Sequence, residues 1–314
     1  MRDFILFLFA FICLQTTAQS SFTFPSLLVE YDSAIIYKHL KIIPVKRKEI
    51  QKNIWSDSTT SFLTLQSGIQ KGYVSIHERG NYAIDNINVL LIKNNSNKPL
   101  ILKAGELLAG GRQDRLIAKD TILLPGNQEY QIPVFCIEET RWSSREKKFT
   151  YAGSAGSDLQ KFIDSAHNQI KLWEEIRKIL KTNNQTNSSS YASFIKQKTN
   201  KDSTNLYVQF FLNSLGKKDS SIVGFIVSTG NRIIGADVFI NSSLFYQMLP
   251  TLLSNYCNEV RLSVKPLLNQ HQMEMKYTAE LFSPTTQNSF LNNRGKRLYY
   301  KGNLIQISGY SFPQ

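Results

Sequence analysis

Cysteine, histidine and long apolar runs are all scarce in this chain of 314 residues. It contains three cysteines and four histidines, and these form neither a CxxC pair nor an HExxH sequence. Because zinc sites are built on such spacings, we expect no metal site and no cofactor. After the N-terminal region no run of eighteen consecutive apolar residues occurs, which excludes a later membrane-spanning helix.

Acidic residues are also few relative to basic ones. The chain has 24 Asp and Glu against 37 Lys and Arg, which gives a formal net charge of +13 and a pI near 9.5. This excess attracts anionic partners such as envelope polymers, lipid head groups or nucleic acid. The basic residues form four short clusters without interleaved aromatic residues, which argues against a nucleic-acid partner and favours a solvated basic surface. These clusters begin at Lys46, Arg145, Lys196 and Arg294.

The first eighteen residues have the pattern of an export signal. Arg2 precedes an apolar core from Phe4 to Leu14, and small residues lead up to Ala18. Eleven apolar residues are too few for the roughly 20 that a membrane-spanning helix needs. We therefore expect residues 1–18 to be a signal peptide that is cleaved, leaving a periplasmic or secreted protein with no transmembrane segment.

Two cysteines, Cys136 and Cys257, lie beyond this signal. Export to an oxidising compartment permits a disulfide between them. Both stand in apolar or helical surroundings, which are equally compatible with two buried free thiols, and their spacing does not decide between the two states.

Residues 19–143 are predicted to be mainly β, with one short helix between Ser61 and Gly72. We expect Leu100–Leu102 to form a hairpin with the strand before it, and a sandwich-like layering of the sheet. Proline has no N–H to donate, so Pro44 and Pro133 are placed at sheet edges or at a bulge. The predicted strands cover residues 35–45, 73–78, 87–93, 100–102, 121–124 and 130–137.

Residues 144–314 change in composition and are predicted to mix helices with a smaller sheet. Apolar residues recur at helical spacing from Ser157 to Leu180, which predicts one long helix. A further helix is expected over residues 205–215, then a β-β-α unit over residues 222–260 and a closing hairpin over residues 296–308. The predicted fold class is α+β, with a predominantly β, sandwich-like N-terminal half and helices plus a β-β-α sheet in the C-terminal half, packed as one globular unit.

The most unusual stretch runs from Lys103 to Trp142. Its first part, Gly105 to Arg115, reads GELLAGGRQDR and is predicted to be a loop at the end of a sheet. Glycine allows close backbone approach, and arginine forks match carboxylate or phosphate geometry, so we predict a binding surface for an anionic small molecule or a glycan. The Lys and Ser/Thr of a P-loop are missing. The candidate ligand-binding residues are Glu106, Gly110, Gly111, Arg112, Gln113, Arg115, Glu138, Arg141 and Trp142.

The same residues allow a purely structural interpretation. In it, Glu106, Arg112 and Asp114 pair among themselves or with Glu138 and Arg141, and so hold two loops together. Structural ion-pair networks of this kind are common in proteins.

Cys136 and Asp237 each allow a catalytic interpretation and a structural one. Cys136 could act as a nucleophile with His77 as its base, but its apolar surroundings favour a packing role. Asp237 could join Glu106 in acid/base chemistry, whereas strand alternation favours an outward or capping side chain.

The stretch from Gly105 to Arg115, with Ile132–Glu138 and Arg141-Trp142, resembles the signature of a bacterial domain family. It is the ARG and rhodanese-phosphatase-superfamily-associated protein domain, and the run Gly235–Ile240 is similar to the distal block of that family. Asp114 stands where many members carry Asn. The family has no established activity, so the resemblance implies kinship and transfers no catalytic role.

We expect an exported, non-enzymatic binding or scaffold protein whose Arg/Gly-rich loop recognises an anionic or glycan-like ligand. The alternative is a hydrolase with Glu106 or Glu138 as acid/base and Arg115 as oxyanion stabiliser. A third hypothesis is a structural envelope protein that binds other proteins through exposed sheet edges. Outward guanidinium groups on Arg112 and Arg115 would support the first hypothesis, and their burial in internal pairs would remove its basis.

Overall fold

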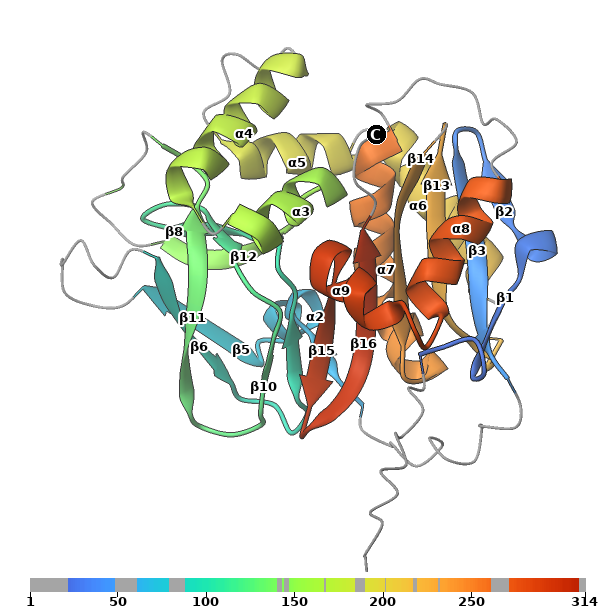
Figure 1. Ribbon diagram of the computed structural model, residues 1–314. Coiled ribbons are helices and arrows are strands. Elements are labelled where there is room, and N and C mark those ends of the chain that lie inside the picture. Colours follow the sequence, from blue (N-terminus) through green and yellow to red (C-terminus); the bar gives the residue numbers. More distant parts are fainter. Residues whose placement is uncertain are drawn as a thin grey trace, which may run out of the picture.

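The α+β class is confirmed by a computed structural model in which antiparallel sheets pack against helices (Figure 1). In the described part of the chain, no helix combines the length and the apolar character needed to cross a membrane. The predicted signal peptide lies outside the described residues. These are residues 22–48, 61–78, 88–139, 143, 147–166, 168–183, 190–200, 202–216, 219–230, 232–260 and 271–310.

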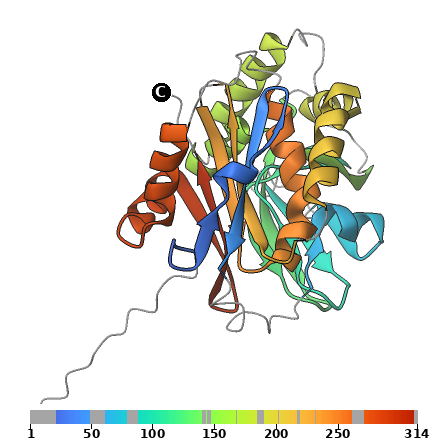
Figure 2. The ribbon, with the colours of Figure 1, turned by 90° about the vertical axis from the view of Figure 1, so that its right-hand side faces the viewer.

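The largest described sheet has the strand order β1-β3-β13-β14-β16-β15, with β2 paired to β3. Its central strands β13 and β14 are buried along nearly their whole length because helices cover both faces, as Figure 2 shows. The strands are β1 (Leu27–Val29), β2 (Ile35–Tyr37), β3 (Leu40–Arg47), β13 (Ile222–Thr229), β14 (Arg232–Phe239), β15 (Gly295–Tyr300) and β16 (Asn303–Tyr310).

This sheet joins the two ends of the chain. β3 pairs with β13 in an antiparallel register that runs from Lys46↔Ile222 to Leu40↔Thr229. The large sheet is therefore built from strands of both the N-terminal and the C-terminal part of the chain. The single strand predicted over residues 35–45 is a hairpin instead, because Lys38 takes a positive φ of 51° and turns β2 back onto β3.

A second, β-rich body holds a six-stranded sheet, β12-β8-β9-β11-β6-β5, and a three-stranded sheet, β10-β7-β4. Apolar side chains of both sheets share one core, in which Ile92 and Val134 meet Leu100 and Leu123, so the two sheets pack in layers. The strands are β4 (Leu63–Thr64), β5 (Val74–Glu78), β6 (Val89–Asn94), β7 (Leu100–Leu102), β8 (Glu106–Gly111), β9 (Arg115–Ile117), β10 (Thr121–Leu123), β11 (Glu129–Cys136) and β12 (Lys147–Ser154).

The predicted hairpin between β6 and β7 is wrong. β7 pairs instead with β10 and with β4, in the other sheet. The buried Asn94 side chain ends β6 and turns the chain, because its amide donates to the carbonyls of Lys98 at 2.7 Å and Leu123 at 3.2 Å. The Asn94 side chain thus makes hydrogen bonds to backbone carbonyls that would otherwise be bonded by a neighbouring strand of a hairpin.

Both strand prolines lie inside sheets, at the residues where a strand exchanges partners. Pro44 falls between the part of β3 that pairs with β2 and the part that pairs with β1. Pro133 is the last β11 residue paired with β6, and Val134 begins the pairing with β9. A residue without an N–H is tolerated at such an exchange, which explains why neither proline marks a sheet edge.

The helices also differ in part from the prediction. The short helix α2 is confirmed, with Thr64 and Ser67 forming a capping box, but the long helix predicted from Ser157 to Leu180 is two helices separated near Asn168. Helices α5, α8 and α9 were not predicted. The described helices are α2 (Leu65–Gln70), α3 (Ser157–Ala166), α4 (Gln169–Thr182), α5 (Tyr191–Asn200), α6 (Asp202–Leu215), α7 (Ser242–Val260), α8 (His271–Phe282) and α9 (Gln287–Arg294).

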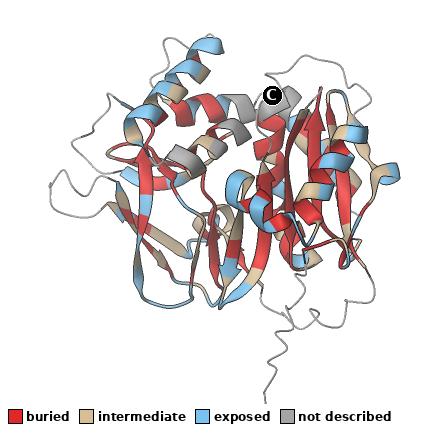
Figure 3. Ribbon diagram, viewed as in Figure 1, coloured by how far each residue is buried: buried red, intermediate tan, exposed pale blue. Residues whose placement is uncertain are grey.

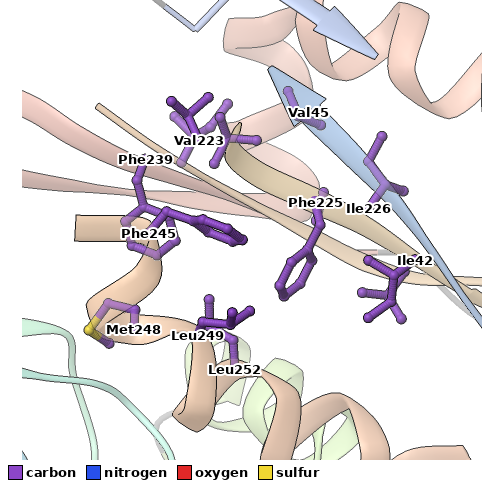
Figure 4. Packing of buried hydrophobic residues seen from close by; sticks show 14 of the residues in the cluster. Ile42, Val45, Val223, Phe225, Ile226, Phe239, Phe245, Met248, Leu249 and Leu252 are labelled. Carbon is purple, nitrogen blue, oxygen red and sulfur yellow. The ribbon is translucent and has the colours of Figure 1, made fainter. Parts of the chain in front are cut away.

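The main core lies between the large sheet and α7. Phe225 of β13 meets Phe245 of α7 with ring centroids 5.6 Å apart in an edge-to-face arrangement, and Leu249 and Leu252 extend this contact along the helix (Figure 4). Figure 3 shows that burial is continuous over the central strands, whereas parts of the outer helices are exposed. The β-β-α unit predicted from the sequence thus forms the buried centre of the large sheet and its helix.

Candidate functional site

The Gly-rich motif forms a β-hairpin, which corrects the prediction of a loop. β8 pairs with β9, with Leu108 opposite Arg115, and the turn spans Arg112–Asp114. Gly110 and Gly111 have φ angles of 134° and 55°. A Cβ on Gly110 would lie 2.5 Å from the carbonyl oxygen of Lys148. Glycine is needed here because the irregular part of β12 lies close beside β8 in the same sheet, and a Cβ on Gly111 would likewise meet the Phe149 ring of β12. Close packing therefore accounts for both glycines.

Arg115 faces the interior, and its predicted outward orientation is wrong. Its side chain is 1% exposed. Nη1 donates to Gln113 Oε1 at 2.8 Å, and Nη2 donates to Glu78 Oε1 at 3.2 Å. A buried guanidinium needs such partners because its desolvation is costly. Arg115 therefore holds the hairpin to β5 and is shielded from any ligand.

Arg112 shares the same acidic partner but remains more accessible. Its backbone N–H donates to Glu78 Oε1 at 3.0 Å, and its Nε lies 3.4 Å from Glu78 Oε2. The guanidinium side chain is 21% exposed. Sequence reasoning missed Glu78 because it belongs to β5 and precedes Arg112 by 34 positions.

The remaining turn residues bind to Glu138, two residues after β11, and to Ser190, which precedes α5. Gln113 donates through Nε2 to the carbonyl of Glu138, and the N–H of Asp114 donates to Glu138 Oε2 at 3.3 Å. Asp114 in turn accepts from Gly110 N–H at 2.9 Å and from Ser190 Oγ at 3.2 Å. We call Glu78, Arg112, Gln113, Asp114, Arg115 and Glu138 the motif corner. The candidates Arg141 and Trp142 lie outside the described residues.

Glu106 stands at the opposite end of β8 and belongs to a different network. Its Oε2 accepts the N–H of Lys103 at 2.8 Å, and its carboxyl is also hydrogen-bonded to Tyr151. Burial raises the pKa of Glu106 to about 8. The strand registers place Glu106 level with Val134, four residues before Glu138, so at about 3.3 Å per residue the two carboxylates lie roughly 13 Å apart along the strands. Glu106 and Glu138 therefore do not meet as an acid/base pair.

The distal motif block contributes Asp237, whose side chain is buried rather than outward or capping. Its Oδ1 accepts from Gln306 Nε2 at 2.8 Å and from Ser308 Oγ at 2.6 Å, and its Oδ2 accepts from the Tyr256 hydroxyl at 2.7 Å. Lys103 Nζ donates to Gln306 Oε1 at 3.0 Å. The two motif blocks are thus connected through one lysine and one glutamine.

Two ammonium groups converge on Asp120 beside this link. Lys103 pairs with its Oδ2, while Lys296 Nζ lies 3.0 Å from its Oδ1 and 3.1 Å from Asp164 Oδ2. Burial alone would raise the pKa of Asp120, but Lys103 and Lys296 hold it well below its usual range. Asp164 also accepts the hydroxyl of Tyr310. We call Lys103, Asp120, Asp164, Asp237, Lys296, Gln306 and Tyr310 the polar seam.

The thiols show no catalytic arrangement. Cys136 is buried, which raises its pKa, and its carbonyl accepts from Gln169 Nε2 at 2.7 Å and Trp173 Nε1 at 2.9 Å. The strand registers place His77 level with Gln131, five residues from Cys136 and so roughly 16 Å away. Cys257 is likewise buried, and both cysteines are free. Among the described residues, no three His, Cys, Asp or Glu side chains group as metal ligands.

Comparison with known proteins agrees with the motif positions. A family model described as the ARG and Rhodanese-Phosphatase-superfamily-associated Protein domain matches residues 28–299, which is most of the chain. No curated protein and no solved structure matches. Both motif blocks fall inside the matched range, and each supplies buried residues to the polar networks described above. The chain therefore belongs to the ARG and Rhodanese-Phosphatase-superfamily-associated Protein domain family.

Proposed function

We propose that this protein is an exported, non-enzymatic binding domain for an anionic or glycan-like ligand. The Arg/Gly-rich motif does not support this function, because Arg115 is buried in internal pairs; the observation that carries the proposal is the formal net charge of +13. The internal pairing of the motif residues instead argues against the hydrolase alternative. A general acid or base must come within hydrogen-bond reach of its substrate. Glu106 and Glu138 are 1% and 2% exposed, and Arg115 is equally buried, so the groups required by the hydrolase alternative do not reach the surface.

The charge of the chain supports an anionic partner. The formal net charge is +13, and the arginines and acids of the motif corner largely neutralise one another. The motif corner therefore does not carry the excess positive charge of the chain, and this excess raises the local concentration of anions around the protein. Export is a part of this proposal that rests on the N-terminal sequence.

A thermal-shift screen tests the binding function. The chain lacking residues 1–18 is heated with acidic polysaccharides, sugar acids, sugar phosphates, neutral sugars and polyamines. We expect stabilisation by acidic compounds, since a ligand at 100 times its Kd adds about 2.7 kcal/mol to the free energy of unfolding. Stabilisation by polyamines alone, or by none of these compounds, contradicts the proposal.

A separate assay distinguishes the hydrolase alternative. The same compounds are incubated with the protein and with Glu106→Gln, and the products are measured by chromatography. We expect no turnover from either protein. Hydrolysis that Glu106→Gln abolishes while its circular dichroism spectrum is unchanged would favour an enzyme.

A further inference from the structure

A pocket lies where α2, the turn before β7 and α7 meet. Its volume is about 600 Å³, which falls within the range of small-molecule sites in proteins. It is remote in sequence from the motif corner, and its walls come from three separate parts of the chain. The described residues that line it are Ser61, Phe62, Leu63, Thr64, Gln66, Ser67, Gln70, Lys71, Tyr73, Ser96, Asn97, Lys98, Gln247, Pro250 and Thr251.

The charged residues that line the pocket are all positive, and the other polar ones are neutral. Lys71 and Lys98 are its charged members, and none of the described lining residues carries a carboxylate. The other polar members offer hydroxyl and amide groups, which both donate to and accept from sugar hydroxyls. Tyr73, 46% exposed, adds an aromatic surface on which an apolar face of a ring can pack.

These cations are available, unlike the arginines of the motif corner. Within the described residues, Lys71 has no ion pair, and Lys98 Nζ contacts only the neutral hydroxyl of Ser61, at 3.0 Å. Gln66 and Gln70 make no side-chain hydrogen bond to the described part of the chain. A bound anion would therefore meet two positive groups without first displacing a carboxylate.

Regular elements hold the walls of the pocket in place. The capping box between Thr64 and Ser67 fixes the start of α2, and Gln247 Oε1 on α7 accepts the N–H of Phe62 at 3.1 Å. The Phe62 ring packs edge-to-face on Tyr300, with centroids 5.2 Å apart. A site on such anchored elements loses little conformational entropy when a ligand binds.

One wall also connects to the family motif. Thr251 of α7 lines the pocket and is hydrogen-bonded to Tyr151 of β12, which in turn is hydrogen-bonded to Glu106. The buried carboxyl of the motif thus positions a pocket hydroxyl through one tyrosine. This link gives Glu106 a positioning role toward the site, although it does not touch the ligand.

We propose that the pocket binds a monosaccharide unit bearing a negative charge, with Lys71 and Lys98 at the phosphate or carboxylate and Tyr73 against the ring. The inference rests on the binding function proposed above and specifies its site and ligand class. The amides of Gln66 and Gln70 bind the sugar hydroxyls, while Gln247 holds the wall through its bond to the N–H of Phe62. A neutral sugar lacks the attraction to the lysines, and inorganic phosphate lacks the ring and hydroxyl contacts.

Isothermal titration calorimetry tests the site with four probes: glucose 6-phosphate, glucuronate, glucose and inorganic phosphate. We expect at least one of the two charged sugars to bind the chain lacking residues 1–18 at least tenfold more tightly than glucose or phosphate. The double variant Lys71→Ala/Lys98→Ala should weaken that binding at least tenfold. Tyr73→Ala should reduce the preference for the charged sugar over phosphate.

A matched control removes the same charge elsewhere. Lys171→Ala/Lys181→Ala changes two exposed lysines of α4 and should leave the affinity unchanged. All four replaced lysines are exposed, so equal melting temperatures are expected and show that folding is intact.

Three results would overturn the pocket, and they separate it from the broader function. If Lys71→Ala/Lys98→Ala binds the charged sugar as tightly as the parent chain does, the ligand lies elsewhere and the binding function stands. The same conclusion follows if the two double variants lose affinity by the same factor. If neither charged sugar binds but the thermal-shift screen still detects an acidic ligand, the pocket assignment fails alone. If that screen detects no acidic ligand either, both proposals fail.

Discussion

At the scale of single residues, Glu78 determines the state of the motif corner. Its carboxylate contacts the guanidinium groups of both Arg112 and Arg115, and it accepts the backbone N–H of Arg112. Arg115 is too deeply buried to exchange this partner for water. One acidic side chain on β5 therefore converts two apparent ligand-binding arginines into structural ones.

Replacing Glu78 should consequently destabilise the protein. Glu78→Gln leaves the Arg115 charge buried without its counter-ion, which costs about 3 kcal/mol in the free energy of unfolding. Urea denaturation measures this loss. The control Glu175→Gln removes the acid from an exposed pair with Lys178 and should cost under about 1 kcal/mol. Equal losses in the two variants would contradict the role assigned to Glu78.

Glu106 should make stability depend on pH in a defined direction. Burial raises the pKa of Glu106 from its usual value of 4.5 to about 8, so between these values the folded state binds a proton that the unfolded state has released. Stability therefore falls as pH rises from about 5 to 8, by up to about 1.4 kcal/mol per pH unit for this group. Asp120 has the opposite sign. Its pKa is lowered in the folded state, so the stability that it contributes at neutral pH is lost only as the pH falls below the usual pKa of an aspartate.

Urea denaturation of the parent chain and of Glu106→Gln across pH 5 to 8 measures the effect. The glutamine can keep the bonds to Lys103 N–H and Tyr151 but does not titrate, so its stability should change less with pH. Identical pH profiles would show that Glu106 ionises normally in the folded chain.

At the scale of elements, the hairpin of β8 and β9 is shaped by its contact with β12. The Gly110 Cα lies so close to the β12 backbone that no side chain fits, and the register of β12 on β8 shifts between Lys147 and Thr150 and again between Tyr151 and Gly153. Glycines that look like ligand-binding features in the sequence thus permit two paired strands to approach closely where their register shifts.

Gly110→Ala should test this contact. The added Cβ lies 2.5 Å from the Lys148 carbonyl oxygen, and the alanine must keep the unfavourable positive φ of Gly110. Together these effects lower the free energy of unfolding by about 3 kcal/mol. Gly72→Ala is the control, because Gly72 has a φ of 71° but no atom within 4 Å of the added Cβ. That variant should lose only about 1 kcal/mol. Thermal unfolding compares the two, and a Gly110→Ala loss no larger than that of Gly72→Ala would contradict the packing explanation.

At the scale of the whole molecule, the polar seam joins the β-rich body to the large sheet. Lys103 follows β7, Asp120 precedes β10, Asp164 lies on α3, and Lys296 lies on β15. Asp120 binds both Lys103 and Lys296, and Lys296 also binds Asp164. Lys296 of the large sheet therefore has both of its acidic partners outside that sheet. All four residues fall within the matched range 28–299, so contacts between distant segments belong to the family domain.

Lys296→Met should loosen this boundary. Removing the ammonium group leaves Asp164 without its lysine and Asp120 with one lysine in place of two, which costs about 3 kcal/mol. Hydrogen exchange should increase in β15, β16 and α3. Arg297→Met is the matched control, because this neighbour on the other face of β15 binds the exposed Asn288 and Asn292. Exchange that rises equally in both variants would argue against the seam as the link.

Much of the fold was predictable because its signals are local. The alternation and turn residues of β13 and β14, the cap of α2 and the closing hairpin each depend on neighbours a few positions apart. Helix α5 was missed because its apolar residues are confined to its first half, Tyr191 to Ile195. Strand β7 was assigned the wrong partner because the role of the Asn94 side chain depends on Leu123. The motif was located correctly, but the orientation of Arg115 and Asp237 was not.

The sequence by itself determined the α+β class, the positive charge and the family, since each depends on composition or on contiguous residues. Only the tertiary structure decided which charges remain available to a ligand. Glu78 reaches Arg115 across 37 positions and Lys103 reaches Gln306 across 203, while Lys71 and Lys98 meet in one pocket. Whether a charge is neutralised or free depends on what folding places beside it, and no local pattern encodes those distant neighbours.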